Sequence, residues 1–205
     1  MLQNKDREKI ENEINDLIEK IKKSAKKAIR EGMSDEQLIE KVVNITVKKF
    51  TPKSKMLLSS ICNILLEETL SDERYKDLKN KAFLYEKDII SEISNCFIFE
   101  VPDNVTYTKS KVEAEKMLAS GGIVISGGLI SIAVNKMFPV VISAIVAAVM
   151  YFALMKCDKK RKHIYEAICE YLDLVGVTLI QWLDNVQEYY CERIKEIEKE
   201  MDVNG

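Results

Sequence analysis

The stretch MLASGGIVISGGLISIAVNKMFPVVISAIVAAVMYFALM, residues 117–155, contains no acidic residue and a single basic one, Lys136, near its middle. We call it the apolar segment. Asn135 is suited to end one helix in a left-handed cap, and Pro139 is suited to the first turn of the next helix. The sequence therefore predicts two apolar helices, at residues 117–134 and 137–155, joined by a tight turn.

The length of these two arms matches a lipid bilayer. At 1.5 Å of rise per residue each arm would span roughly 27 to 28 Å, close to the hydrocarbon thickness of about 30 Å. A basic run follows the second arm at Lys159, Lys160, Arg161 and Lys162. By the positive-inside rule, both ends of the hairpin face the cytoplasm and the turn faces away. We expect a two-pass protein of the inner membrane with both termini cytoplasmic.

Small residues within the arms recur at intervals of four. This spacing lets membrane helices approach closely, so it favours packing of the arms on each other or on other copies of the chain. Such spacing also arises by chance in segments rich in small residues. The serines could line a narrow lumen in a homo-oligomer. The pairs are Gly122 and Ser126, Gly127 and Ser131, and Ser143 and Ala147.

Two groups of polar residues next to the arms, the basic run and the turn, each allow two interpretations. The basic run could bind anionic lipid headgroups or a polyanionic ligand, or it could be a stop-transfer anchor that only fixes topology. Asn135 and Lys136 could form a polar ring at a pore mouth, or they could be a hydrated turn. The sequence leaves these alternatives open.

Helical patterns cover nearly all of the remaining chain. An apolar stripe of helical period predicts a helix over residues 4–30 that ends at Gly32. The capping box Ser34-Asp35-Glu36-Gln37 opens a second helix, which Thr51-Pro52 is expected to stop. A third helix then buries Met56, Leu57, Ile61, Ile64 and Leu65. A fourth, capped at Ser71-Asp72-Glu73, carries the stripe Tyr75, Leu78, Ala82, Tyr85, Ile89, Ile93 and Cys96.

The predicted fold class is all-α, a cytosolic helical bundle with a two-helix transmembrane hairpin and a long C-terminal amphipathic helix. We divide the chain into the bundle at residues 1–97, an extended connector at 98–108, the hairpin unit at 109–155 and a basic stop with the long helix at 156–205. The connector is predicted from its β-branched and aromatic residues around Pro102-Asp103-Asn104.

The chemistry that the sequence lacks excludes several classes of function. The formal net charge of −2 argues against a dedicated nucleic-acid binder, and the charged first residues argue against a cleaved signal peptide. The single histidine, His163, has no catalytic companions, so we predict no enzyme, no cofactor and no metal site. The five scattered cysteines form no CxxC pair and favour reduced thiols.

The order of these elements resembles the small two-pass membrane effectors of bacterial antiphage, abortive-infection systems. The resemblance rests on a helical bundle, the arms SGGIVISGGLISIAV and FPVVISAIVAAVMYFAL, and a basic stop before a long helix, without a specific motif. It implies that the soluble part senses a cytosolic regulatory protein or ligand. Oligomeric membrane helices would then form a pore or otherwise disrupt the inner membrane.

Two further interpretations remain open. In one, the hairpin is buried inside a soluble bundle until a trigger releases it, as in the channel domains of colicins, whose apolar hairpins resemble this one in size. In the other, the chain is a membrane-anchored scaffold whose bundle binds a protein partner. All three interpretations place the lipid bilayer among the partners of the chain.

Overall fold

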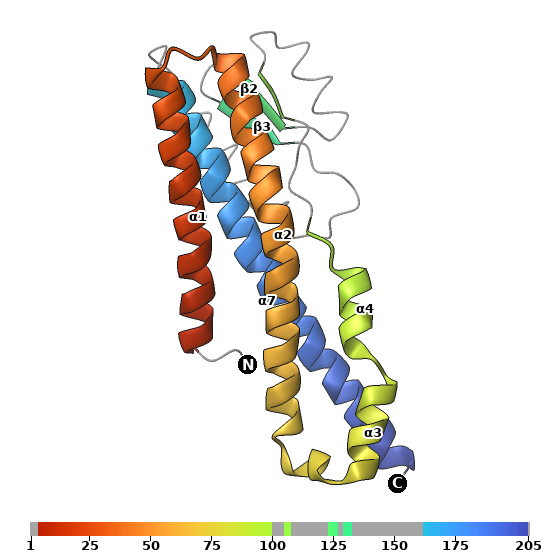
Figure 1. Cartoon of the computed structure of the whole chain (residues 1–205). Helices are drawn as coiled ribbons and strands as arrows, with labels where there is room; N and C mark the ends of the chain where they lie inside the picture. Colours follow the sequence, from red (N-terminus) through yellow and green to blue (C-terminus); the bar gives the residue numbers. More distant parts are fainter. Residues whose placement is uncertain (1–3, 100–104, 108–122, 127–128, 133–161, 205) are drawn as a thin grey trace. The chain divides into compact units, whose positions relative to one another are not determined.

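The computed structural model describes residues 4–99, 105–107, 123–126, 129–132 and 162–204 (Figure 1). The described chain is predominantly helical, which confirms the predicted helical class. Its elements are α1 (Asn4–Arg30), α2 (Asp35–Leu70), the 3-10 helix η1 (Glu73–Lys76), α3 (Leu78–Glu86), α4 (Ile89–Cys96), β1 (Val105–Tyr107), β2 (Ile123–Ser126), β3 (Leu129–Ile132) and α7 (Lys162–Asn204).

The chain forms two compact units, and α1, α2 and α7 each contribute to both. Unit 1 comprises Met1–Glu11, Pro52–Phe99 and Leu179–Gly205. Unit 2 comprises Asn12–Thr51 and Glu100–Thr178. Each unit therefore joins segments that are far apart in the sequence. The domain division predicted from the sequence, with boundaries after residues 97, 108 and 155, concerns consecutive stretches of chain and does not describe these units.

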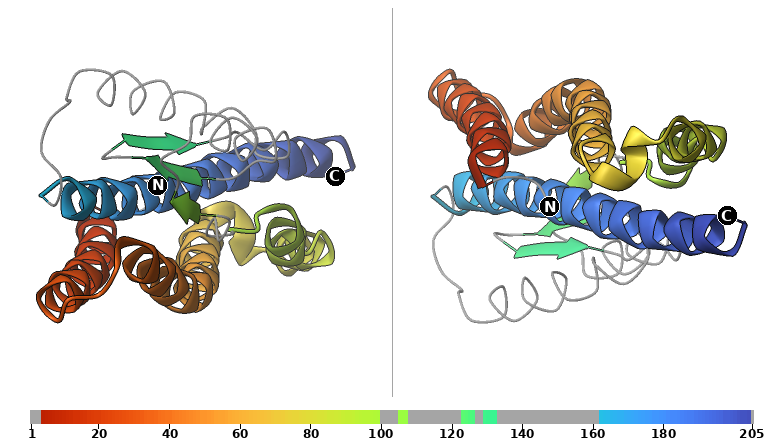
Figure 2. Two further views of the ribbon diagram at one scale, coloured as in Figure 1. Left: turned by 90° about the horizontal axis from the view of Figure 1, so that it is seen from above. Right: turned by 90° about the horizontal axis from the view of Figure 1, so that it is seen from below.

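In unit 1, η1, α3, α4 and the second part of α2 pack along the last part of α7 (Figure 2). The core is mainly apolar, and the hydroxyl of the buried Tyr190 shares a hydrogen bond of 3.0 Å with Thr69 Oγ1. Its buried residues include Leu57, Ile61, Leu65, Leu84, Ile89, Ile93, Leu179, Val186, Tyr190 and Ile197.

In unit 2, the last part of α1 packs beside the first part of α7. Ile14, Ile18 and Ile21 of α1 are almost completely buried, as are Ile168 and Leu172 of α7. Gly176 allows this close approach, because a Cβ atom at its position would lie 2.4 Å from Cδ1 of Ile18. This face of α7 is thus part of the core of unit 2, as an amphipathic helix requires.

The first helix ends and the second begins as the sequence predicts. Gly32 follows α1 with a φ of 82°, a left-handed conformation that glycine adopts without steric cost. Ser34 and Gln37 form the predicted capping box. The Gln37 amide donates to Ser34 Oγ at 3.3 Å, and the Ser34 amide donates to Gln37 Oε1 at 3.4 Å.

The predicted break at Thr51-Pro52 is wrong, because α2 continues through Pro52 to Leu70. Proline removes one backbone hydrogen bond from a helix interior, but packing of an apolar face can outweigh that loss. Phe50 is fully buried before Pro52, and Leu57 and Leu58 are buried one turn after it. The same proline begins the unit 1 part of α2.

Residues 71–96, predicted as one helix, form η1, α3 and α4 instead. Three aspartates start these elements: Asp72, Asp77 and Asp88 each accept a hydrogen bond from a backbone amide of the element that follows. The predicted inward stripe is correct for Tyr75, Ile89 and Ile93. It is wrong for four exposed residues: Leu78, Ala82, Tyr85 and Cys96. Met56 of α2, also predicted inward, is exposed as well.

The first predicted membrane arm is not helical where the structure describes it. Residues 123–126 and 129–132 form the antiparallel strands β2 and β3, and β1 of the predicted connector pairs with β2 in parallel. The register joins Ser126 to Leu129, so two residues, Gly127 and Gly128, separate the strands. The helix predicted over residues 117–134 is therefore wrong at residues 123–126 and 129–132, which are strands.

The local sequence explains this correction. Ile123, Val124 and Ile125 before the glycines are β-branched, which favours strands over helices. A Gly-Gly pair between two such runs is a strong signal for a two-residue hairpin loop. The prediction followed the length of the apolar run, which does not by itself separate a buried strand from a helix. The second arm, residues 137–155, lies outside the described residues.

Among the residues that the structure describes, no helix combines the length and the apolar character needed to cross a membrane.

Candidate functional site

The apolar segment and its flanks are the candidate functional site. Of the residues predicted to pack or to line a pore, the structure describes two, Ser126 in β2 and Ser131 in β3. Both lie in strands, so the helical spacing that paired them with Gly122 and Gly127 does not hold there. Lys162 of the basic run begins α7. The other predicted site residues lie outside the described part: Gly122, Gly127, Asn135, Lys136, Pro139, Ser143, Ala147, Lys159, Lys160 and Arg161.

Two aromatic contacts hold the chain on α7 shortly before the apolar segment begins. The rings of Phe97 and Tyr189 have centroids 5.3 Å apart at an interplanar angle of 61°. The rings of Phe99 and Trp182 have centroids 5.5 Å apart. Such edge-on and tilted pairs stabilise by about 0.5 to 1.5 kcal/mol beyond the area they bury. The last described residue before β1, Phe99, is thus attached to the same helix that begins after the apolar segment.

A polar cluster next to these rings fixes α4 on α7. The Tyr189 hydroxyl donates a hydrogen bond to Glu92 Oε1, and Arg193 Nε donates to Glu92 Oε2 at 3.1 Å. The bonds from Tyr189 and Arg193 outweigh partial burial and lower the pKa of Glu92. The hydrogen bond to Glu92, with partial burial, raises the pKa of Tyr189 to about 12. Glu92 is therefore ionised and Tyr189 neutral at neutral pH.

Further contacts attach η1 and the end of α3 to the last turns of α7. Lys87 pairs with Glu200, and its ammonium also lies 4.7 Å from the centroid of the Phe83 ring. Tyr75 Oη donates to Glu198 Oε1 at 3.4 Å. Burial, with the neighbouring charge of Glu198, raises the pKa of Tyr75 to about 12. Residues 73–97 are thus held on α7 by polar contacts at several points.

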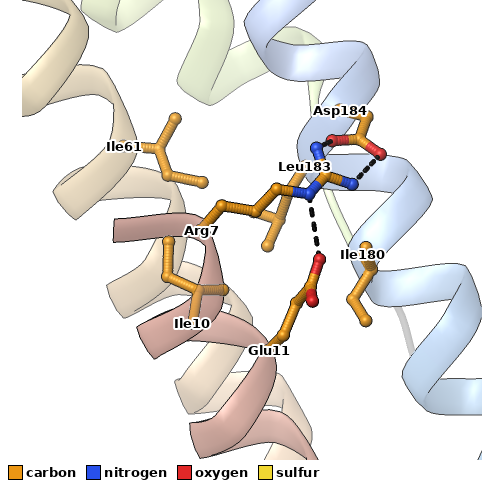
Figure 3. A pocket seen from close by; sticks show the side chains of 7 residues that line it. All are labelled: Arg7, Ile10, Glu11, Ile61, Ile180, Leu183 and Asp184. Atoms are coloured by element: carbon orange, nitrogen blue, oxygen red, sulfur yellow. Dashed lines mark hydrogen bonds and ion pairs between the residues drawn. The ribbon is translucent and has the colours of Figure 1, made fainter. Parts of the chain in front are cut away.

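Arg7 forms a second polar centre in unit 1 beside a small hollow (Figure 3). Its guanidinium donates from Nη1 and Nη2 to the two carboxylate oxygens of Asp184, at 2.6 and 2.9 Å, and from Nε to Glu11 at 2.9 Å. These bonds raise the pKa of Arg7. The hollow has a volume of about 20 Å³, enough for about one water molecule and too small for a substrate. Ile10, Ile61, Ile180 and Leu183 line the rest of it.

The arrangement of Arg7 and Asp184 is structural. Local sequence gave no signal for it, because the two residues lie 177 positions apart in the chain. Burial raises the pKa of the Cys62 thiol to about 11, which leaves it protonated and unreactive. No group of three or more metal-ligating side chains occurs within the described ranges of the chain.

No protein-family model matches the sequence, and no curated protein or solved structure is similar enough to give a match. The function proposed below therefore rests on this chain alone.

Proposed function

We propose that this protein is an oligomeric membrane effector that uses the apolar segment to breach a bilayer, and that the segment is held outside the bilayer until a trigger releases it. The observation behind the proposal that the segment is held outside the bilayer is the pairing of β2 with β3 inside the apolar segment. It supports the released-hairpin interpretation over permanent insertion.

The physical argument concerns backbone hydrogen bonds. The three-stranded sheet has the order β1-β2-β3, so its outer strands have edges without a strand partner among the described residues. Such open edges do not occur in the hydrocarbon of a bilayer, where each backbone group needs an internal partner. Insertion as two helical arms, residues 117–134 and 137–155, would then require β2 and β3 to convert into the first arm. Each arm is long enough to cross, and only Lys136 between them is charged.

The position of the apolar segment in the chain supports an even number of crossings. The chain before the segment is held on α7 through Glu92, which accepts hydrogen bonds from Tyr189 and Arg193, and it leaves the segment into Lys162, where α7 begins. Entry and exit are thus connected to one helix. A hairpin with both termini on the cytoplasmic side satisfies this connection, whereas a single crossing separates the two ends. The role in bacterial defence is proposed on the resemblance in layout alone.

The test combines membrane extraction with leakage of a dye from vesicles. We expect the protein to be released by alkaline carbonate before triggering, to resist extraction after triggering, and then to release dye. Val146→Asp should abolish leakage, because a charge in mid-hydrocarbon costs about 2.5 to 3.5 kcal/mol. Val203→Asp, at an exposed position of α7, is the matched control and should leak like the unchanged protein.

Each result separates the interpretations. Resistance to carbonate without any trigger would contradict the held-outside part of the proposal and favour a permanent two-pass protein. Stable membrane attachment without dye release under any condition would contradict the breaching role and favour a membrane-anchored scaffold. Leakage by Val146→Asp equal to that of Val203→Asp would show that the second arm is not the membrane-active part.

A further inference from the structure

The second half of α1 concentrates positive charge. Its sequence from residue 20 to residue 30, KIKKSAKKAIR, contains six basic residues and no acidic one. The whole chain has 31 basic and 33 acidic residues, so this density is a local departure from a nearly balanced composition. The first half of the helix carries acidic residues as well, including Glu13, Asp16 and Glu19.

The helix geometry places most of this charge on one side. Ile18, Ile21, Ala25 and Ala28 are buried in unit 2. At 100° per residue, the basic positions fall on the side of the helix away from this stripe. They are exposed, with the Lys27 side chain at 78%. We call this set the cationic face: Lys20, Lys23, Lys26, Lys27 and Arg30.

Interactions among the described residues do not account for the cationic face. Lys22, the sixth basic residue, is used structurally and pairs with Asp173 at 2.7 Å. Lys27 makes a loose pair with Glu31 at 3.7 Å. Lys20, Lys23, Lys26 and Arg30 form no ion pair with any described residue. The dipole of α1 favours cations in its last turn, but Lys20 and Lys23 lie well before it.

We propose that the cationic face binds the anionic headgroups of a lipid leaflet and so positions unit 2 on the membrane before the apolar segment inserts. This inference rests on the proposed function. Strands of the apolar segment belong to the same unit as the cationic face, so docking there would bring the segment to the surface. The presence of the apolar segment in the same unit favours lipid over nucleic acid, which is the alternative polyanion.

The test compares two triple variants of the full-length protein in flotation with vesicles of phosphatidylcholine, with and without phosphatidylglycerol. Lys20→Gln/Lys23→Gln/Lys26→Gln removes three charges from the cationic face. Lys55→Gln/Lys79→Gln/Lys81→Gln removes three charges from exposed positions of unit 1 and is the matched control. At about 1 kcal/mol per charge, we expect the first variant to bind anionic vesicles on the order of 100-fold more weakly. The control should bind like the unchanged protein.

Binding should also weaken with added salt and be absent on purely zwitterionic vesicles before triggering. Circular dichroism and thermal unfolding verify that the variants fold. If the triple variant unfolds, the single variants Lys20→Gln and Lys26→Gln should each weaken binding about fivefold. Equal binding by the two triple variants would overturn the proposal, as would binding to nucleic acid without binding to anionic vesicles.

The flotation and dye-release experiments can contradict the two proposals independently. If no protein, changed or unchanged, releases dye but flotation still depends on the charges of the cationic face, the breaching role is contradicted and the docking surface is supported. Normal dye release by the Lys20, Lys23 and Lys26 variant, with unchanged flotation, would contradict the docking surface alone.

Discussion

In unit 2, α1 and α7 approach closely where Ile18 faces Gly176, because glycine has no Cβ atom. A Cβ at residue 176 would lie 2.4 Å from Cδ1 of Ile18, and Ile18 is only 4% exposed, so its side chain has little space to move. Ile14 Cγ2 lies farther away, at 3.6 Å, an ordinary contact. A methyl group added at residue 176 would therefore clash with Ile18 and not with Ile14.

We predict strong coupling between Gly176→Ala and Ile18→Val, because valine lacks the Cδ1 atom that the new methyl group would meet. Ile18→Val alone should lower the free energy of unfolding by about 1 kcal/mol. The double variant should be more stable than the sum of the single effects by about 1 kcal/mol or more. Urea unfolding measures this cycle. The control pair Gly176→Ala and Ile14→Val should be nearly additive, and equal coupling in both cycles would refute the close contact.

Glu92 gives a prediction about pH. Its pKa is lowered in the folded protein by the bonds from Tyr189 and Arg193, so its contribution to stability is present above the pKa of the unfolded chain. That contribution is lost as the pH falls through the lowered folded value. Glu92→Gln should reduce the free energy of unfolding by about 1 kcal/mol at neutral pH. The difference from the unchanged protein should shrink under acidic conditions.

Urea unfolding across the acidic range measures this effect, with Glu86→Gln, an exposed glutamate of α3, as the control. The control should be nearly neutral at every pH. A Glu92→Gln difference that is constant with pH would mean that the carboxylate charge is not what stabilises the attachment of α4.

At the scale of elements, local signals predicted helix ends better than helix continuity. Gly32 and the Ser34–Gln37 capping box involve neighbouring residues only, so the sequence located them correctly. Pro52 was misjudged because burial on either side, which depends on distant parts of the chain, outweighs a local breaker. The partners of Glu92 lie about a hundred residues away, and no local signal could have found them.

The apolar segment was misassigned at β2 and β3 for a different reason. A run of apolar residues satisfies the composition of a membrane helix and of a buried strand equally, and length favoured the helix. The Gly127-Gly128 pair between β-branched residues was the available signal for a hairpin.

We predict that this glycine pair determines the conformation of the segment. Gly127→Val/Gly128→Val should eliminate the pairing of β2 with β3, because two-residue hairpin loops need conformations that valine avoids. Gly127→Asn should preserve it, because Asn-Gly suits the same loop. Amide hydrogen exchange at residues 123–126 and 129–132 measures the pairing. Protection that persists in the valine variant would contradict a hairpin closed by this loop.

At the scale of the whole molecule, the attachment of Phe99 to Trp182 links the helical part to the apolar segment. Phe99 is 8% exposed and packs on the Trp182 ring, so the chain entering the segment is fixed to α7 in the described state. Conversion of β2 and β3 into the first membrane arm would require the chain to move away from this contact. The aromatic contact is therefore the last described attachment of the chain to α7 before the apolar segment.

Trp182 is the single tryptophan of the chain, so its fluorescence reports on this contact directly. We expect its emission to shift to longer wavelength when anionic vesicles and the trigger are added, because loss of Phe99 exposes the indole to water. Phe99→Leu should shift the emission before any trigger and should lower the threshold for dye release, since a weaker contact releases the segment more readily. Ile98→Leu, at an exposed neighbouring position, is the control and should change neither. Dye release with an unchanged Trp182 spectrum would mean that the segment inserts while Phe99 stays attached, and that the trigger acts within the apolar segment itself.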